Sequence, residues 1–284
     1  MALRLHTVAP RHGIAWLKAA FGTYARRPLG LTMLFVVFLF SAIVLLALPY
    51  VGQIVVMGAL PLLSLGYMIA TRAVLAGGAA HPGHLIEALR GDTRQRAALL
   101  QLCALYALAT VVILLLADAV DGGRFERMQL LLATPDRTPA DDAELDALFD
   151  DDRLAWGLVV RFGLAALLAI PFWHAPALVH WGGQGVLQSL FSSTLAVWRN
   201  RGAMTLYVVA WVAMIALFSA AVGALFGLLG TGQLAGFVAL PAGLMFTCVF
   251  YVSLYFTFVD VFGGDGGDGG DVPGQPPSDP MSDS

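Results

Sequence analysis

The feature that most constrains this chain is a pair of long segments without a single ionisable side chain. Residues 29–71 and 202–259 contain no Asp, Glu, Lys, Arg or His. About 20 apolar residues cross the hydrocarbon core of a bilayer as a helix, so each segment is too long for one span. Each segment must therefore fold back once, and we predict a protein that crosses the membrane several times.

The composition supports this class. The chain is 58% hydrophobic and 12% charged, with a mean hydropathy of +0.77, whereas soluble domains are about 45–50% apolar and about 25% charged. The net charge is −3, and nothing in the sequence indicates nucleic-acid binding. Cys103 and Cys248 both lie in apolar segments, so we expect small buried hydrophobes and no structural disulfide.

Lipid cannot satisfy free backbone N–H and C=O groups, so apolar segments of this length should be helices. The alternating pattern of a membrane β-barrel does not occur in them. We therefore predict an all-α membrane protein with six transmembrane helices arranged as three hairpins, with kinks at Pro61 and Pro241. The predicted spans cover residues 29–48, 54–75, 97–117, 154–173, 203–229 and 234–259.

Basic residues are unevenly distributed among the connections, and this asymmetry predicts the orientation. Cytoplasmic connections collect Lys and Arg. In a six-span topology one side receives the basic residues before the first, third and fifth spans, whereas the other receives two short uncharged turns and an acidic loop, residues 118–153. Both termini are therefore predicted to be cytoplasmic, in a bacterial inner membrane, with an uncleaved first span. The cytoplasmic basic residues are Arg4, Arg11, Lys18, Arg26, Arg27, Arg72, Arg90, Arg94, Arg96, Arg199 and Arg201.

This topology divides the chain into three parts. Residues 1–27 form a cytoplasmic N-terminal segment, residues 28–260 a membrane domain, and residues 261–284 a cytoplasmic tail rich in Gly, Asp and Pro. The tail has almost no apolar surface to bury, so we expect it to be disordered. It also matches a calcium β-roll repeat formally, but that fold needs many stacked copies.

The stretches before the first, third and fifth spans share a pattern of apolar residues at helical spacing followed by arginine. This spacing predicts amphipathic helices lying in the cytoplasmic interface. We expect three repeats of interfacial helix plus hairpin, with the positive-inside rule alone as the alternative explanation. The apolar faces are Ile14, Leu17, Phe21 and Tyr24; Leu85, Ile86 and Leu89; and Leu187, Leu190, Phe191, Leu195 and Trp198.

The acidic loop should be a hydrated cap that contains one short helix. Thr138 is the expected N-cap, Pro139 the first helical residue, and Asp141 a favourable charge at the N-terminus. Leu145 and Leu148 would give this helix an apolar side. A divalent-cation site is the alternative, but the EF-hand spacing is absent.

Three short segments resemble a proteobacterial inner-membrane protein family of unknown function. They are residues 172–181, which read FWHAPALVHW, residues 188–192, and residues 196–200, which read AVWRN. The resemblance extends to the basic N-terminal segment with Trp16 and Pro28. The family supplies no activity or catalytic residues, so it implies only a membrane location. A weaker likeness, in architecture alone, is to the membrane domain of some bacterial glycerophosphodiester phosphodiesterases.

The same segments suggest structural roles at the membrane surface. Trp173, Trp181 and Trp198 suit the aromatic belt at the headgroup level, where Arg199 would also lie. Pro176 should break the fourth span as it leaves the membrane. A metal site is a further interpretation of the histidines at this level, although the spacing between His174 and His180 is poor for two ligands on one helix. These histidines are His81, His84, His174 and His180.

Arg161 is the only charged residue well inside a predicted span. A cation at mid-bilayer costs about 2.5–3.5 kcal/mol on insertion scales, so a partner is expected. Asp118 ends the third span at a similar depth, and we predict an Arg161–Asp118 pair that clamps the third and fourth spans. The rival interpretation is a substrate or ion site inside the bundle.

The sequence contains no catalytic triad, P-loop, zinc-protease or dinucleotide motif, and we expect no cofactor. The leading hypothesis is a membrane protein without evident catalytic chemistry, in a structural, accessory or partner-binding role. Its partners would be membrane lipids and another membrane protein or a second copy. A small transporter or channel is the second hypothesis, and a membrane-interface enzyme or metal-binding protein is the third. Gly223 and Gly227 offer a surface for close helix contact, which we expect to be used within the chain.

Overall fold

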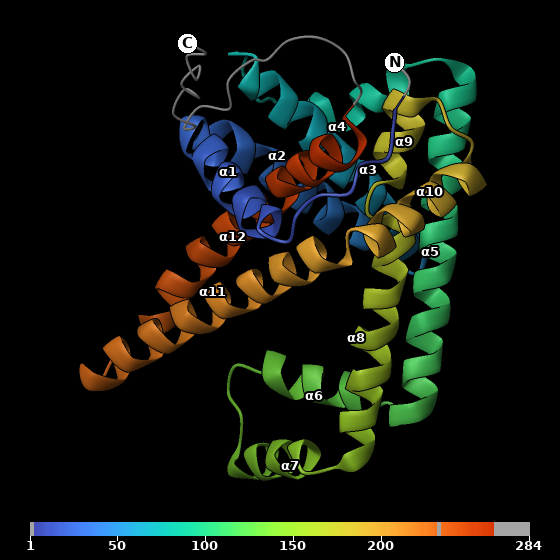
Figure 1. The fold of residues 1–284 in the computed structure, drawn as a ribbon. Coiled ribbons are helices and arrows are strands. Elements are labelled where there is room, and N and C mark those ends of the chain that lie inside the picture. The colour runs from blue at the N-terminus through green and yellow to red at the C-terminus, as the bar shows by residue number, and fades with distance from the viewer. Residues whose placement is uncertain (1–2, 232–233, 264–284) are drawn as a thin grey trace, which may run out of the picture.

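The computed structural model describes residues 3–231 and 234–263 (Figure 1). This part of the chain is built from helices and contains no strand. The helices are α1 (His12–Arg26), α2 (Pro28–Leu46), α3 (Val51–Leu75), α4 (His84–Glu87), η1 (Ala88–Arg90), α5 (Thr93–Asp121), α6 (Arg124–Ala133), α7 (Pro139–Phe149), α8 (Asp152–Phe172), α9 (Ala175–Gly182), α10 (Val186–Arg199), α11 (Arg201–Leu228) and α12 (Ala235–Phe262).

Six of the described helical segments are long and apolar enough to cross a membrane. They are α2, α3, α5, α8 continued by α9, α11 and α12, and each overlaps one predicted span. The prediction of an all-helical protein with six apolar spans is therefore confirmed. Some helices run past the predicted ends, because polar residues such as Thr93 and Asp260 continue them.

The six apolar segments lie in contact as three pairs of consecutive segments: α2 with α3, α5 with α8, and α11 with α12. The backbones of α5 and α8 approach closely at Gly157, where a Cβ atom would lie 2.4 Å from the Cβ atom of Asp121. Small residues permit this approach between membrane helices. The arrangement of the three pairs as hairpins across a bilayer remains a prediction.

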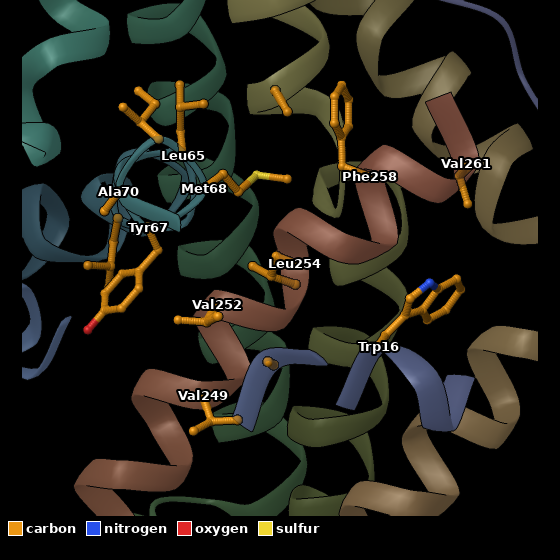
Figure 2. Packing of buried hydrophobic residues seen from close by; sticks show 14 of the residues in the cluster. Trp16, Leu65, Tyr67, Met68, Ala70, Val249, Val252, Leu254, Phe258 and Val261 are labelled. Atoms are coloured by element: carbon orange, nitrogen blue, oxygen red, sulfur yellow. The ribbon is translucent and has the colours of Figure 1, made fainter. Parts of the chain in front are cut away.

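The main core forms where α1 meets α3, α11 and α12 (Figure 2). Trp16 of α1 is 2% exposed, and Tyr67 of α3 and Val252 of α12 are fully buried. The Tyr67 hydroxyl donates to the carbonyl oxygen of Leu31 at 2.8 Å, so α2 is tied to the same centre. Because lipid is as apolar as these side chains, close packing and hydrogen bonds hold such a core together.

The helix predicted before the first span exists as α1, but most of its apolar face packs against protein. Leu17 is 9% exposed and Ala20 is fully buried, whereas Ile14 is 40% exposed. At Gly13 a Cβ atom would lie 2.4 Å from the carbonyl oxygen of Ala203 in α11. Thus α1 belongs to the core, and its interfacial position remains a prediction.

The other two helices of the predicted repeat differ from α1. The middle one is a single turn, α4, followed by η1. The third, α10, presents its apolar stripe outward: Leu187 is 81% exposed and Phe191 69%, while Ser189 and Ser193 are fully buried. An outward apolar stripe suits a helix in the membrane interface.

The segment before α1 lies across the ends of α10 and α12. Its backbone binds Asn200, which accepts from the Val8 N–H at 2.8 Å and donates to the His6 carbonyl at 3.0 Å. Asp260 near the end of α12 accepts from Trp16 Nε1 at 2.6 Å and lies 2.8 Å from His12 Nδ1. Asn200 therefore binds the segment before α1 and Asp260 binds α1 itself, and the sequence revealed neither contact.

The acidic loop folds into α6 and α7, at the end of the bundle opposite α9 (Figure 1). The predicted helix start is confirmed: Thr138 is the N-cap of α7, Pro139 follows it, and Thr138 and Asp141 form a reciprocal capping box. The predicted apolar side is present at Leu145, which is 9% exposed. The tail predicted to be disordered lies outside the described residues, apart from its first three.

Candidate functional site

A cleft opens beside the α11–α12 pair, where this pair diverges from α5 and α8. It comprises a cavity of about 640 Å³ beside α11 and α12 and a smaller one of about 140 Å³ beside α3, α5 and α8. Trp173, Phe250 and Tyr251 line both cavities. Figure 1 shows the reason: α11 and α12 leave the rest of the molecule side by side, at a steep angle to α5 and α8. We call this feature the intramembrane cleft.

Aromatic side chains line most of the larger cavity. The Trp173 ring meets Tyr207 edge-on at 5.9 Å and Phe250 edge-on at 6.0 Å between centroids. Trp211 lies 6.0 Å from Phe250, again edge-on. Edge-to-face pairs of this kind contribute about 0.5–1.5 kcal/mol beyond the area they bury. The wall is therefore apolar, rigid and preformed.

Hydrogen bonds fix two of these aromatic residues to α12. The Ser253 hydroxyl donates to the carbonyl of Phe250 at 2.5 Å, so its oxygen accepts from the Tyr207 hydroxyl, also at 2.5 Å. Trp173 Nε1 donates to the hydroxyl oxygen of Thr257 at 3.2 Å. Thus α11 and the end of α8 are held against the same face of α12.

The break between α8 and α9 places Trp173 at the cleft. The helix α8 ends at Phe172 and α9 begins at Ala175, with Pro176 in the first turn of α9. The N–H of His174 at the break donates to the Ser193 hydroxyl at 3.0 Å, so α10 satisfies a backbone group that the break releases. The proline break predicted from the sequence is therefore present, two residues earlier in the chain than Pro176.

His174 is fully buried beside the cleft and has a structural environment. Its Nε2 lies 3.3 Å from Thr257 Oγ1. Thr257 already donates its only proton to the carbonyl of Leu254 at 2.8 Å. The His174 ring must then carry its proton on Nε2. Its Nδ1 has no hydrogen-bond partner among the described residues.

The histidines considered as metal ligands do not come together. His81 and His84 stack at 3.8 Å between centroids, with Glu87 accepting from His84 at 2.6 Å. His180 lies against Gln95, which also binds the backbone carbonyl of His180. Within the described residues no three His, Cys, Asp or Glu side chains could hold a metal ion. The metal hypothesis therefore has no geometric basis there.

The remaining residues of the predicted surface belt occupy different environments. Trp181 packs against Phe258 at 5.2 Å and lies 6.0 Å from the Arg72 guanidinium. Trp198 is 69% exposed, and Arg199 beside it is exposed. Trp198 is the most exposed of the three tryptophans, with the Arg201 guanidinium 5.8 Å from its ring, and the aromatic belt remains a prediction. Trp173 and Trp181 are packed within the protein.

Arg161 has a partner in α5, but the partner is Asp121 and not Asp118. Arg161 Nη2 lies 3.0 Å from Asp121 Oδ2, and the Asp121 side chain is fully buried. The prediction failed by one helical turn because α5 continues past the expected end of the third span. The Phe125 ring covers the guanidinium at 3.9 Å. The Arg161–Asp121 pair joins α5 to α8, which are the third and fourth spans. The predicted ionic link between these spans is therefore present, with a different carboxylate.

Sequence reasoning missed most of the aromatic residues of the cleft. Tyr207 and Trp211 in α11, like Phe246 and Phe250 in α12, are separated by four residues, so each pair shares one helix face. This spacing was the available signal. It could not identify the facing helix, because the steep angle of α11 and α12 depends on tertiary packing.

Beyond the cleft, the α11–α12 pair has no neighbour among the other described helices. We call residues 215–231 and 234–243 the outer hairpin. Leu217 is 72% exposed, Leu228 89% and Leu240 78%. A Cβ atom at Gly223 or Gly227 would meet no other atom within 4 Å. The expectation that these glycines mediate contacts within the chain is therefore wrong.

Six apolar helices and a buried ion pair between two of them define a multi-pass membrane protein of the bacterial inner membrane. The chain is similar to a probable inner membrane protein of Burkholderia thailandensis, with 28% identity over 264 residues that cover 92% of this chain and 94% of the relative. This similarity agrees with the resemblance carried by residues 172–181. No family model and no solved structure matches the chain.

Proposed function

We propose that this protein is a non-catalytic accessory subunit whose intramembrane cleft receives a transmembrane helix of a different membrane protein. The carrying observation is that one wall of the cleft is apolar and uncovered. Val208, Val212 and Ile215 line the cleft on α11 and are 50%, 62% and 46% exposed. These residues recur at helical spacing, so they form one continuous stripe.

The size of the cleft suits a helix. A helix about 10 Å across rises about 5.4 Å per turn, so one turn occupies roughly 400 Å³. A cavity of about 640 Å³ therefore takes between one and two turns of a crossing helix. The small residue Gly243 on the opposite wall, with no atom within 4 Å of its Cβ position, allows a close approach.

The polar groups of the cleft favour a helix over a polar solute. The Thr247 hydroxyl donates to the carbonyl of Gly243 at 2.8 Å and is thus satisfied. Trp211 Nε1 is buried and has no acceptor among the described residues. If the indole turns toward the cleft, a hydroxyl or amide side chain on a partner helix would supply that acceptor, as commonly happens between membrane helices. A transport path would need several unpaired polar groups, so the cleft does not support the transporter or channel hypothesis.

The proposal includes the orientation inferred from the arginines, with both termini in the cytoplasm and α6 and α7 outside. The positive-inside bias supports it. Reporter fusions after residues 90 and 192 should then give cytoplasmic signals, and a fusion after residue 140 an extracytoplasmic one. A cytoplasmic signal at residue 140 would invert the whole topology.

Site-specific photo-crosslinking in cells tests the cleft. A photoreactive residue at Val212 should give one discrete adduct larger than the chain. The same residue at Leu217, on the opposite face of α11, should give none. Gly243→Leu should abolish the Val212 adduct by filling the cleft. Gly236→Leu on the same helix is the matched control, because Gly236 is also free of neighbours within 4 Å.

Two outcomes would contradict the accessory role. If Val212 crosslinks only to lipid, the cleft is a lipid surface and no helix enters it. If the adduct contains a second, differently tagged copy of this chain, the protein associates with itself and is not a subunit for another protein. If Gly243→Leu and Gly236→Leu both abolish the adduct, its loss does not result from filling the cleft.

A further inference from the structure

A second hollow shares no lining residue with the intramembrane cleft. It has a volume of about 680 Å³ and is bounded by α3, α5, α6 and Arg161 of α8. Both polar and apolar residues line it. We call it the outer groove, because residues of α6, which belongs to the acidic loop, form part of its lining.

The lining of the outer groove changes from apolar to polar along both long helices. The four lining residues of α5 follow the spacing i, i+3, i+4, i+7, and the three of α3 follow i, i+1, i+4, so each set lies on one face of its helix. The two deeper residues are apolar on both helices, and the residue at the rim is polar. From the middle of the helix toward its end, the order is Met57, Ile54 and Gln53 on α3, followed by Tyr50 in the turn before it, and Val111, Leu114, Leu115 and Asp118 on α5.

The acidic groups at the rim are not neutralised by the protein. Asp118 and Glu126 line the outer groove, are exposed, and form no ion pair or side-chain hydrogen bond with a described residue. The nearby arginines are used elsewhere. The pairs are Arg124 with Asp151, Arg127 with Glu144, Arg137 with Asp142, and Arg161 with Asp121. Two carboxylates at the rim thus remain available to a cation.

Arg161 contributes one further unused group. Its Nη2 binds Asp121, but its Nε–H is buried and has no acceptor among the described residues. A buried N–H without an acceptor costs about 1–3 kcal/mol. The Phe125 ring covers the guanidinium at 3.9 Å, and an anionic oxygen in the groove would satisfy the Nε–H once this ring turns aside. The outer groove therefore offers a donor for an anion below two acceptors for a cation.

We propose that the outer groove binds one phospholipid whose headgroup carries an ammonium beyond its phosphate, as in phosphatidylethanolamine. An acyl chain lies along the apolar residues of α3 and α5. The phosphate accepts from Arg161 Nε, and the ammonium reaches Asp118 and Glu126. Phosphatidylglycerol lacks the ammonium and adds an uncompensated negative charge beside the two carboxylates, so it binds more weakly.

Native mass spectrometry of delipidated protein tests this selectivity. The protein in mild detergent is titrated with phosphatidylethanolamine or phosphatidylglycerol of identical acyl chains. Wild-type protein should bind the first about tenfold more tightly, the effect expected of a charge-assisted hydrogen bond. The variant Asp118→Asn/Glu126→Gln should lose this preference. Both residues are exposed, so folding should not suffer.

Asp136→Asn/Asp146→Asn is the matched control. It removes two carboxylates from the same loop that are exposed and do not line the groove, and it should keep the full preference. Soluble glycerophosphoethanolamine distinguishes a lipid from a free headgroup and should not compete. Equal binding of the two lipids, equal loss in both double variants, or competition by the soluble headgroup would each overturn the proposal. Photo-crosslinking at Val212 does not involve this groove, so the two proposals can fail separately.

Discussion

The main core and the outer hairpin both contain parts of the apolar helices α11 and α12, yet they differ in how completely the chain covers them. In the main core a Cβ atom at Gly13 would lie 2.4 Å from the carbonyl oxygen of Ala203. A Cβ atom at Gly223 in the outer hairpin would meet no other atom within 4 Å. Trp16 is 2% exposed and Leu228 is 89% exposed. The contrast indicates that hydrophobicity alone does not bring membrane helices together. Small residues and hydrogen-bond partners do.

The largest expected effect concerns the one ion pair buried between spans in the described structure. Arg161→Ala and Asp121→Ala should each lower the free energy of unfolding by about 3–5 kcal/mol, because each leaves an uncompensated charge in a low-dielectric site. The double variant should lose clearly less than the sum. Asp118→Ala should change it by less than about 0.5 kcal/mol. Unfolding titrations in mixed detergents measure all four variants, and additive losses would show that the two charges do not interact.

The next effect tests the comparison directly. Gly13→Ala places a methyl group against the backbone of α11 and should destabilise the protein by about 1–3 kcal/mol. Gly223→Ala in the outer hairpin should be neutral or stabilising, since Ala is the better helix former by about 1 kcal/mol. Thermal unfolding of the two variants in the same detergent measures the difference. Equal losses would mean that the outer hairpin is packed in the free protein.

A smaller effect concerns the turn between α2 and α3. Tyr50 has φ +60° and ψ −52°, and the Val51 N–H donates to the Pro49 carbonyl at 2.6 Å, which together form the strained type of γ-turn. Tyr50→Gly should stabilise the protein by about 1 kcal/mol. It also removes a side chain from the rim of the outer groove, so lipid retention should fall while stability rises. A parallel change in both quantities would contradict this assignment.

The smallest effect should appear in the acidic loop as the pH falls. Hydrogen bonds from Thr138 lower the pKa of Asp141 below its ordinary 3.8, and those from Arg127 lower the pKa of Glu144 below 4.5. Lowered values mean that both groups stabilise the folded loop above these ordinary pKa values. The contribution is lost as pH falls through the folded values. The amide protection factors of α6 and α7, which correct exchange rates for their intrinsic pH dependence, should be unchanged between about pH 7 and 5 and fall below about pH 4. Arg127→Gln should weaken this dependence.

Much of the fold could be predicted because the responsible forces are local. The spans follow from uninterrupted apolar sequence, and the start of α7 follows from the cap formed by Thr138 and Asp141. The partner of a buried charge was harder to predict from the sequence. The sequence favoured Asp118 as the partner of Arg161, because the third span was expected to end there, whereas α5 continues to Asp121. An error of one turn was enough to select the wrong carboxylate.

The sequence by itself determined that this chain is an all-helical membrane protein with six apolar spans, because lipid leaves backbone groups no alternative to helical hydrogen bonds. It also determined the helix cap of the loop. Only the tertiary structure decided that Asp121 pairs with Arg161, that α1 enters the core, and that α11 and α12 diverge from the bundle to open the intramembrane cleft. Those features depend on the depth and angle at which helices cross, which close packing between distant residues fixes and no local pattern encodes.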